Sequence, residues 1–241
     1  MILYGKNSVY ERLKANPKSI RKILLADNFS QPDIEALIAT RNIAVERLSL
    51  KQLTILAHTQ NPQGIIAKVE KFTYSPFDDL LSQSRSPQLS LIFLDRIYDP
   101  QNLGAIIRTS ACMGGFAIVI PKFKACEVSD TVLHVAQGGE NYVPISMVSN
   151  LSNALISAKK GGYWVVGAVT DDEAENVYTH SFPFPLALVL GSEGRGVRYG
   201  VRKHLDVKVR IPAKGAQLSL NVNAACAIFC HEIAKQRANP R

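Results

Sequence analysis

The sequence lacks the features that would place the chain in a membrane or a secretory pathway. Its apolar runs, such as 89–94 and 186–190, are far shorter than the ~20 residues that a membrane-spanning helix needs. Residues 1–6 contain no apolar core of a signal peptide. We therefore expect a cytoplasmic protein with no membrane partner.

Metal ligands and paired cysteines are also scarce. The chain has four cysteines and five histidines, and none of them recurs at the spacing of a familiar metal site. Cys226 and Cys230 lie one helical turn apart among alanines, so we interpret the cysteines as reduced core residues. The sequence predicts no metal.

Two common phosphate-binding fingerprints are missing. Residues 191–196, GSEGRG, place Glu193 where the dinucleotide fingerprint has its second glycine, and a carboxylate there would oppose a pyrophosphate. The glycine upstream of Gly5-Lys6 that a P-loop requires is also absent. This pattern disfavours a nicotinamide oxidoreductase. Glu193 follows an apolar strand, and this position favours a functional role for its carboxylate. The alternative is that Glu193 only forms an ion pair with Arg195 or Arg198.

The composition is that of a globular protein with excess positive charge. The 241 residues are 46% hydrophobic and 20% charged, and the net charge of +8 favours a polyanionic partner such as RNA, DNA or an anionic membrane surface. Residues 195–214 contain seven basic side chains and one acid, Asp206. Such a run is usually a solvated face, but its position between two candidate ligand loops predicts contacts to a phosphate backbone.

The first 70 residues predict a small α/β unit with short elements. We expect helices at 8–15, 32–40 and 50–57 and strands at 20–26, 43–45 and 64–69. Residues 71–88 contain two prolines and four serines, with a possible short helix at 78–81, and are predicted to form a linker.

Residues 89–241 repeat an alternation of apolar strands and helices. Strands are expected at 89–94, 116–120, 145–148, 163–168, 186–190 and 207–211, and the last helix at 220–237. Strands that are apolar on both faces and joined by helices predict a parallel sheet covered on two sides.

Polar loops follow the first of these strands and the last. Residues 99–110 include Asn102, which could cap a helix, and Arg108, whose apolar neighbours suggest that it needs an anionic partner. Residues 211–225 place Ser219, Asn221 and Asn223 at a strand–loop–helix junction, where capping explains one of them and a ligand could explain the others.

The loops together resemble one family. The patterns N-x-G-x-x-x-R-[ST], L-V-L-G-S-E-G-x-G and I-P-x-x-G-x-x-x-S-L-N-V, in this order, resemble the SpoU/TrmH family of RNA ribose 2′-O-methyltransferases over residues 89–237. Residues 4–9 and 63–67 are similar to the ribosomal-protein-like RNA-binding domain of the 23S rRNA guanosine methyltransferases. Residues 137–140 depart from the run of small residues that relatives usually have there.

The resemblance implies an architecture and a set of site residues. It implies a SPOUT-type parallel sheet with a C-terminal trefoil knot (89–241), an RNA-binding domain (1–70), a homodimer, and S-adenosylmethionine as cofactor. The implied catalytic residues are Asn102, Arg108, Glu193, Ser219 and Asn221. The implied cofactor-binding residues, acting largely through backbone groups, are Gly191, Ile211 and Leu220.

The implied substrate is RNA, specifically a guanosine of 23S rRNA. The alternatives are a tRNA ribose 2′-O-methyltransferase and a non-catalytic RNA-binding relative, and the joint presence of Arg108 and 219–221 disfavours the second. A ribose hydroxyl holds its proton tightly at neutral pH, so the site must stabilise a developing alkoxide. A guanidinium resists deprotonation, and we therefore expect Arg108 to act electrostatically rather than as a base.

Overall fold

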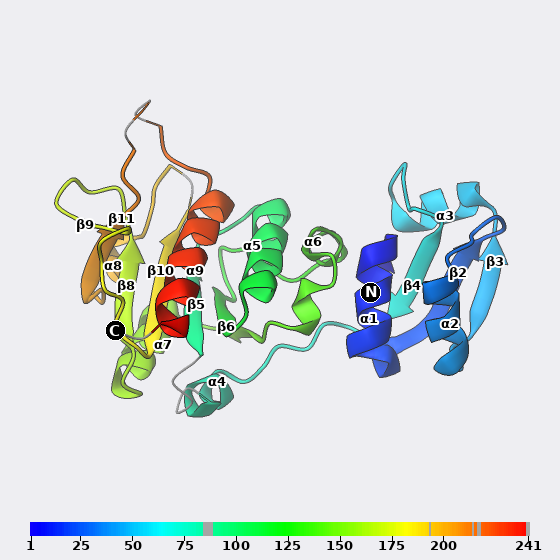
Figure 1. Cartoon of the computed structure of the whole chain (residues 1–241), viewed down its shortest axis with the longest axis horizontal. Helices are drawn as coiled ribbons and strands as arrows, with labels where there is room; N and C mark the ends of the chain where they lie inside the picture. The colour runs from blue at the N-terminus through cyan, green and yellow to red at the C-terminus, as the bar shows by residue number, and fades with distance from the viewer. Residues whose placement is uncertain (84–88, 193, 214, 216–217, 240–241) are drawn as a thin grey trace.

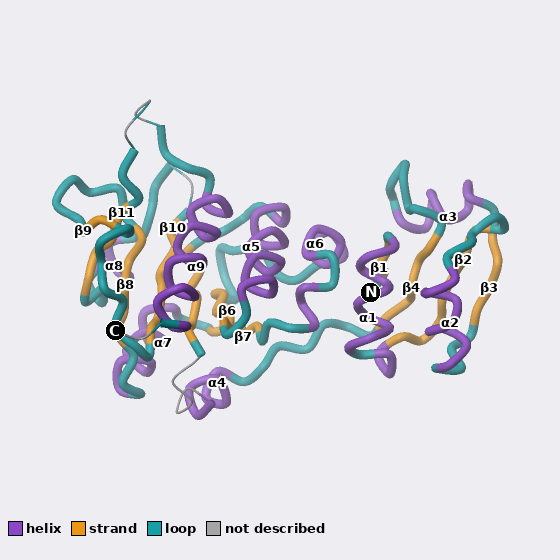
Figure 2. Tube along the Cα trace, viewed as in Figure 1, coloured by secondary structure: helices purple, strands orange, loops and turns teal. Residues whose placement is uncertain are grey.

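The computed structural model describes residues 1–83, 89–192, 194–213, 215 and 218–239, and it contains two sheets (Figures 1 and 2). A four-stranded sheet with the order β1-β4-β2-β3 is formed near the N-terminus, and a seven-stranded sheet with the order β7-β6-β5-β10-β8-β11-β9 follows. The two units lie side by side along the long axis of the molecule (Figure 1).

The N-terminal unit packs helices against a mixed sheet. Its strand β4 pairs antiparallel with β1 and β2, while β2 and β3 are parallel. The predicted segments 20–26, 32–40 and 50–57 are confirmed as β2, α2 and α3. The elements are β1 (Ile2–Tyr4), α1 (Lys6–Ala15), the 3-10 turn η1 (Pro17–Ser19), β2 (Ile20–Ala26), α2 (Pro32–Thr40), β3 (Val45–Leu48), α3 (Leu50–Ala57) and β4 (Ile65–Val69).

The strand predicted at 43–45 was misplaced by two to three residues. Strand β3 spans Val45–Leu48, not 43–45, and pairs with β2 from Ile23 opposite Val45. The chain first has to leave α2, which it does through Asn42 at φ 51°. Because β3 is a largely exposed edge strand, polar side chains such as Glu46 are tolerated in it, and the apolar pattern alone misplaced the strand.

Part of the predicted linker packs against the second unit. Backbone N–H of Ser75 donates to the carbonyl of Ile145, and the hydroxyl of Tyr74 accepts from the N–H of Val128. The predicted short helix is present as α4 (Phe77–Gln83), which buries Leu80 below the second sheet. This segment therefore follows the surface of the second unit instead of standing free of it.

The second sheet is parallel throughout, as predicted. Every pairing between its strands is parallel. Its strands are β5 (Ser90–Asp95), β6 (Phe116–Pro121), β7 (Ile145–Val148), β8 (Trp164–Ala168), β9 (Glu175–Asn176), β10 (Leu186–Gly191) and β11 (Val207–Arg210), and its helical elements are α5 (Pro100–Met113), α6 (Asp130–Ala136), η2 (Gly139–Asn141), α7 (Leu151–Lys160), α8 (Tyr199–Arg202) and α9 (Val222–Ala238).

Alternating side chains of the central strands enter two separate apolar layers. Ile92 and Leu94 of β5 face the cluster that includes α5, α6 and α9, which follow one another from left to right as α9, α5 and α6 in Figure 1. Leu91 and Phe93 face the cluster that includes α4, α7 and α8. Both faces of the strands are thereby removed from water, which explains why their sequences show no polar alternation.

Helix α9 is fixed beside α5 by Arg237. Its guanidinium donates to the carbonyls of Gly114 and Gly115, both at 2.6 Å, and lies over the ring of Phe116. Burial lowers the pKa of Arg237. The basic end of α9 therefore caps the C-terminal end of its neighbour α5.

The cysteine prediction holds only in part. Cys226 and Cys230 are buried on α9, but Cys112 is exposed on α5 because that helix turns one face to solvent. In the part of the chain that the structure describes, no group of three or more histidine, cysteine or acidic side chains could hold a metal ion. No described helix is both long and apolar enough to cross a bilayer.

Candidate functional site

The candidate site lies where the strand order of the second sheet reverses. Strands β6 and β7 extend from β5 on one side, and β10, β8, β11 and β9 extend on the other. Because β5 and β10 are parallel, with Asp95 opposite Gly191, their following loops leave the same edge of the sheet. Ligands of open parallel sheets bind at this kind of switch point.

A pocket of about 310 Å³ opens at this edge. It is formed by the loop between β5 and α5, the loop after β10, and the start of α9. The lining residues are Arg96, Ile97, Tyr98, Asp99, Asn102, Ser192, Arg195 and Val222. The structure thus brings together residues 96–102, residues 192–195 and Val222, which are far apart in the chain.

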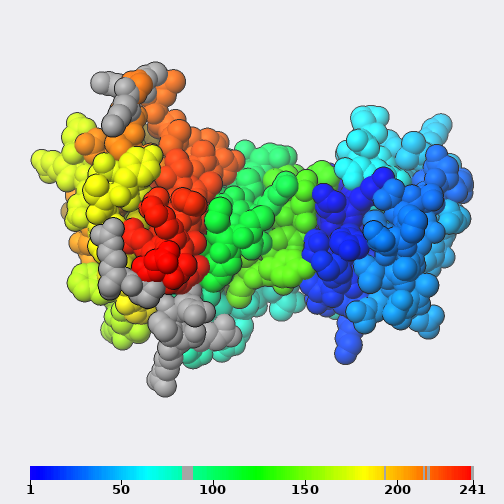
Figure 3. Space-filling model, viewed as in Figure 1, coloured from blue at the N-terminus to red at the C-terminus, as the bar shows by residue number. Residues whose placement is uncertain are grey.

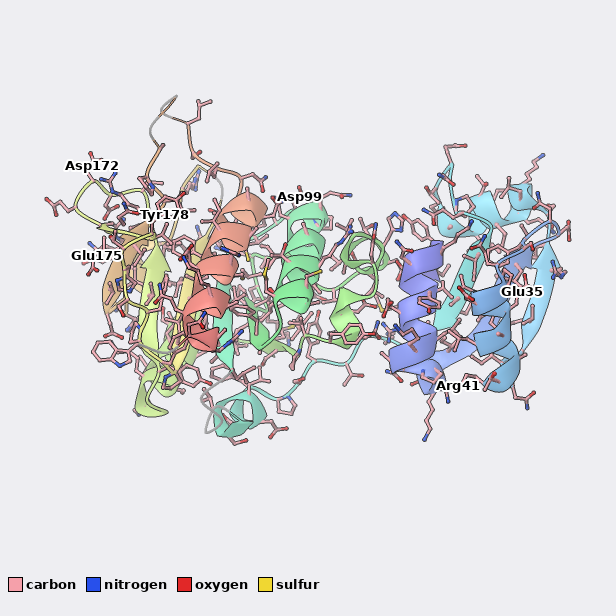
Figure 4. All side chains as sticks on the ribbon, in the orientation of Figure 1. Glu35, Arg41, Asp99, Asp172, Glu175 and Tyr178 are labelled. Atoms are coloured by element: carbon pink, nitrogen blue, oxygen red, sulfur yellow. The ribbon has the colours of Figure 1, made fainter. Side chains whose placement is uncertain are left out.

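Among the described residues, Asn102 is the predicted catalytic residue that lines this pocket. It does not cap α5, because Asp99 is the N-cap and accepts from the backbone N–H of Gln101 at 2.9 Å (Asp99 is labelled in Figure 4). Asn102 is instead buried, and its Oδ1 accepts from Nδ2 of Asn223 at 3.3 Å. This amide contact joins the start of α5 to the start of α9.

The sequence interpretation missed Arg96. This residue follows β5 directly and has φ of 63°, which is uncommon for a side chain of this size. Its Nε is buried with no hydrogen-bond partner among the described residues. A charge immediately after a buried strand was the available signal, but its left-handed backbone could not be read from the sequence. Arg96 and Arg195 supply the pocket with two guanidinium groups that form no ion pair with any described carboxylate.

The glycine of β10 is required by the loop that follows it. A Cβ on Gly191 would lie 2.1 Å from the carbonyl carbon of Gly196, because the chain turns back through a bridge between Ser192 and Gly196. The tight turn predicted from three glycines is confirmed. Gly191 therefore has a structural role in addition to any contact with a ligand, while Glu193 lies outside the described residues.

Much of the basic stretch is already engaged by carboxylates. Arg198 binds the buried Asp95 through Nε at 2.6 Å and also donates its backbone N–H at 2.9 Å. Arg202 pairs with Asp171, and Lys208 lies 3.6 Å from the same carboxylate. The predicted phosphate contacts of this stretch are therefore untested for the cations that already have carboxylate partners, and the Arg198 ion pair joins the end of β5 to the loop after β10. Lys214 lies outside the described residues.

Asn221 is the N-cap of α9. Its side chain accepts from the N–H of Asn223 at 2.9 Å, so the capping alternative is confirmed for this residue. Ser219 and Leu220 precede it on an exposed loop, and Ile211 is half-buried just after β11. These three residues do not line the described pocket.

Arg108 lies apart from the pocket. It is six residues beyond Asn102, about 9 Å along the helix, and its side chain is exposed. The apolar residues Ile106 and Ile107 are buried in the core instead, so the anionic partner expected for Arg108 has to come from outside this helix. Among the described residues it has no ion-pair partner. Gly139 packs closely against the backbone of Arg108, since a Cβ on Gly139 would lie 3.1 Å from the Cα of Arg108.

Comparisons with known proteins match both units. The model of the SpoU rRNA Methylase family matches residues 90–231, and the model described as RNA 2′-O ribose methyltransferase substrate binding matches residues 2–75.

Similar proteins cover nearly the whole chain. The 23S rRNA (guanosine-2′-O-)-methyltransferase RlmB of Pseudomonas syringae is 31% identical over 99% of this chain and 97% of its own. The putative TrmH family tRNA/rRNA methyltransferase YacO of Bacillus subtilis is 34% identical over 98% and 95%. The SpoU methyltransferase AviRb of Streptomyces viridochromogenes, solved in complex with AdoMet, shares the fold at a TM-score of 0.82 and 22% identity over 99% and 90% of the two chains.

Proposed function

Because the chain belongs to the SpoU rRNA Methylase family, we propose that it transfers a methyl group from S-adenosylmethionine to the ribose 2′-hydroxyl of a guanosine in 23S rRNA. The observation that carries this proposal is that residues of all three motifs, Asn102, Ser192 and Val222 among them, line one pocket at the switch point of the parallel sheet. Relatives named for a guanosine of 23S rRNA favour this substrate over tRNA.

The loops after β10 and β11 are suited to the cofactor. One strand, β8, separates β10 from β11, so Gly191 and Ile211 leave the sheet about 10 Å apart. That spacing leaves room for a nucleoside between the two loops. We propose that backbone groups of Gly191, Ile211 and Leu220 hold S-adenosylmethionine there. The bound cofactor supplies an electrophilic methyl group on a sulfonium.

The pocket itself is suited to the RNA strand. Its guanidinium groups, Arg96 and Arg195, can bind the phosphates that flank the target nucleotide. Asn102 can donate to the ribose or hold the loops in register, as its contact with Asn223 does already. We assign Ser219 and Asn221 to contacts with ribose or loop, and Glu193 to fixing the geometry.

Arg108 is proposed to stabilise the developing 2′-alkoxide. Its exposed position needs a further surface to form a closed site, and a second copy of the chain can supply one. On α9 the residues Ala224, Ala227 and Ile228 are only partly buried, which leaves an apolar face next to α5. We propose that the chain forms a homodimer through this face, which a measurement of molar mass by light scattering would test.

The remaining features of the family are proposed for this chain as well. We divide it into an RNA-binding domain (1–70), a linker (71–88) and a methyltransferase domain (89–241). We also propose that the second domain carries a trefoil knot, which is supported by the insertion of β10 between β5 and β8 and the return of α9 onto α5. A cytoplasmic location follows from a ribosomal RNA substrate.

Transfer of a labelled methyl group tests the proposed reaction. After incubation with 23S rRNA, the RNA is digested with alkali, which cannot cleave next to a 2′-O-methyl ribose because the attacking hydroxyl is blocked. Label should remain in an alkali-resistant dinucleotide that contains guanosine. Label in mononucleotides would mean base methylation and would overturn the proposal.

A further inference from the structure

A buried ion pair joins the two units. Nη2 of Arg12, on α1, donates to Oε1 of Glu140, on η2, at 2.9 Å. The two side chains are 9% and 0% exposed. The pair belongs to a larger contact that we call the seam, formed by Tyr4, Glu11 and Arg12 of the first unit and His134, Gly138, Glu140 and Tyr142 of the second.

The rest of the seam is closely fitted. The ring of Tyr4 stacks on that of His134, with centroids 4.0 Å apart, and the hydroxyl of Tyr142 donates to Glu11. Gly138 adopts φ of 91°, and a Cβ there would lie 2.4 Å from the Cβ of Glu11. In the space-filling view the surface of α1 abuts the surface of the second unit (Figure 3). The seam therefore favours one relative orientation of the two units.

The ion pair is a poor source of stability. Burial raises the pKa of Glu140 even though Arg12 lies beside it, so loss of hydration outweighs the attraction. Nε of Arg12 is also buried without a hydrogen-bond partner among the described residues. Apolar side chains of similar size would stabilise such a position equally well or better. A charged pair that loses hydration and adds little stability is suited to specifying one orientation of the two units.

The seam continues directly to Arg108. Glu140 lies in the three-residue turn η2, and the preceding Gly139 packs against the backbone of α5 at Arg108. Arg12 and Arg108 thus lie on opposite sides of one short, buried turn. A single layer of residues therefore separates Arg12 of the first unit from the backbone of the candidate catalytic arginine.

We propose that Arg12 and Glu140 are positioning residues for the methylation: they fix the first unit against η2, so that an RNA held by that unit presents one ribose at a set distance from Arg108. This inference rests on the proposed function. It predicts that the ion pair determines which ribose is modified and how well the RNA is used, without a part in the chemistry or in cofactor binding.

The test compares the full-length enzyme with the double variant Arg12→Met/Glu140→Met. The unfolding temperature and the affinity for S-adenosylmethionine should be retained, whereas kcat/KM for 23S rRNA should fall between about tenfold and a hundredfold, mainly through KM. Mapping of alkali-resistant sites should show label on more than one ribose. The matched control is Lys22→Met/Glu46→Met, which removes an exposed ion pair of 2.6 Å within the first unit and should leave the modified ribose and the affinity for S-adenosylmethionine unchanged.

Two further measurements keep the inference testable. If the double variant does not fold, Tyr142→Phe removes one exposed seam hydrogen bond and should shift site selection in the same direction by a smaller amount. Small-angle X-ray scattering should show a broader distance distribution for the double variant than for the unaltered enzyme. Unchanged scattering together with an unchanged site and kcat/KM would overturn the inference. An unaltered enzyme that methylates no ribose would contradict the proposed function instead, and the scattering would still test the seam.

Discussion

The two units differ in how they expose their sheets and their charges. In the second unit β5, β6 and most of β10 are buried on both faces, whereas β3 of the first unit is largely exposed. The first 70 residues carry ten basic and six acidic side chains, while the other 171 carry eighteen and fourteen. The two parts therefore have the same net charge, and the smaller unit carries it on fewer residues.

The difference separates two tasks. A sheet covered on both sides is a rigid frame that can hold strand-end loops to a fraction of an ångström, which bond formation requires. A small unit with an exposed sheet edge and a denser positive charge can instead contact a polyanion over its surface. Four predictions test this contrast between the two units.

The greatest change should be in stability. Phe93→Ala, in the buried strand β5, should lower the free energy of unfolding by about 3–5 kcal/mol because it leaves a cavity below the second sheet. Val45→Ala, in the exposed strand β3 of the first unit, should change it by no more than about 0.5 kcal/mol. Urea denaturation followed by circular dichroism measures both. Equal losses would mean that the two sheets are buried alike.

The second prediction separates chemistry from RNA binding. Arg108→Ala should lower kcat by about 10²–10³ while the affinity for S-adenosylmethionine stays the same, because Arg108 is assigned to the nucleophile. Arg21→Ala, which removes an exposed cation of the first unit, should leave kcat unchanged. Single-turnover methylation and cofactor titration measure the two quantities. A normal rate for Arg108→Ala would refute the assignment, and loss of cofactor binding would make the residue structural.

The third prediction concerns the phosphate contacts of the pocket. Arg96→Gln/Arg195→Gln should reduce the slope of log affinity against log salt by roughly 1 to 2 units, because each free cation displaces about 0.7 to 0.9 counterions. Arg198→Gln/Arg202→Gln should leave the slope unchanged, since Asp95 and Asp171 already bind those side chains. RNA binding measured over a salt series distinguishes the pairs. A reduced slope for Arg198→Gln/Arg202→Gln, with an unchanged slope for Arg96→Gln/Arg195→Gln, would place the phosphate contacts on the helix α8 side of the loop.

The fourth and most modest change compares two helix caps. Asn221→Ala and Ser49→Ala should each cost about 1 kcal/mol of unfolding free energy, because each removes an N-cap side chain. Only Asn221→Ala, at the start of α9, should also lower the methylation rate. If the rate is unaffected by both substitutions, Asn221 is a cap and nothing more.

Sequence reasoning was most successful where a local pattern decides the structure. Segments such as 20–26, 32–40 and 50–57 were predicted residue for residue, because strand or helix periodicity and capping act within a few positions. It failed at β3, whose place depends on pairing with β2, and it missed β9 and α8, which are too short to show a period. Element type is a local property, while the ends of edge strands depend on their neighbours.

The candidate site shows the same division. The motifs alone selected Asn102, which lines the pocket, because residue type and spacing carry the family pattern. The sequence could not give the left-handed backbone that directs Arg96 to the pocket, nor show that Arg198 is bound by Asp95 across 103 positions. It also could not show that helix α5 turns Arg108 to solvent while its apolar neighbours are buried.

The order of the amino acids was enough to determine the family, the parallel sheet of the second unit and the identity of the motif residues, because each of these depends on local order and spacing. The folded arrangement was needed to decide which cations are free, which polar residue caps which helix, and that Arg12 is joined to Glu140 at the seam. Ion pairs and caps depend on distance in space. A chain of 241 residues contains many possible partners for each charged group, and their separation along the sequence does not show which one is near.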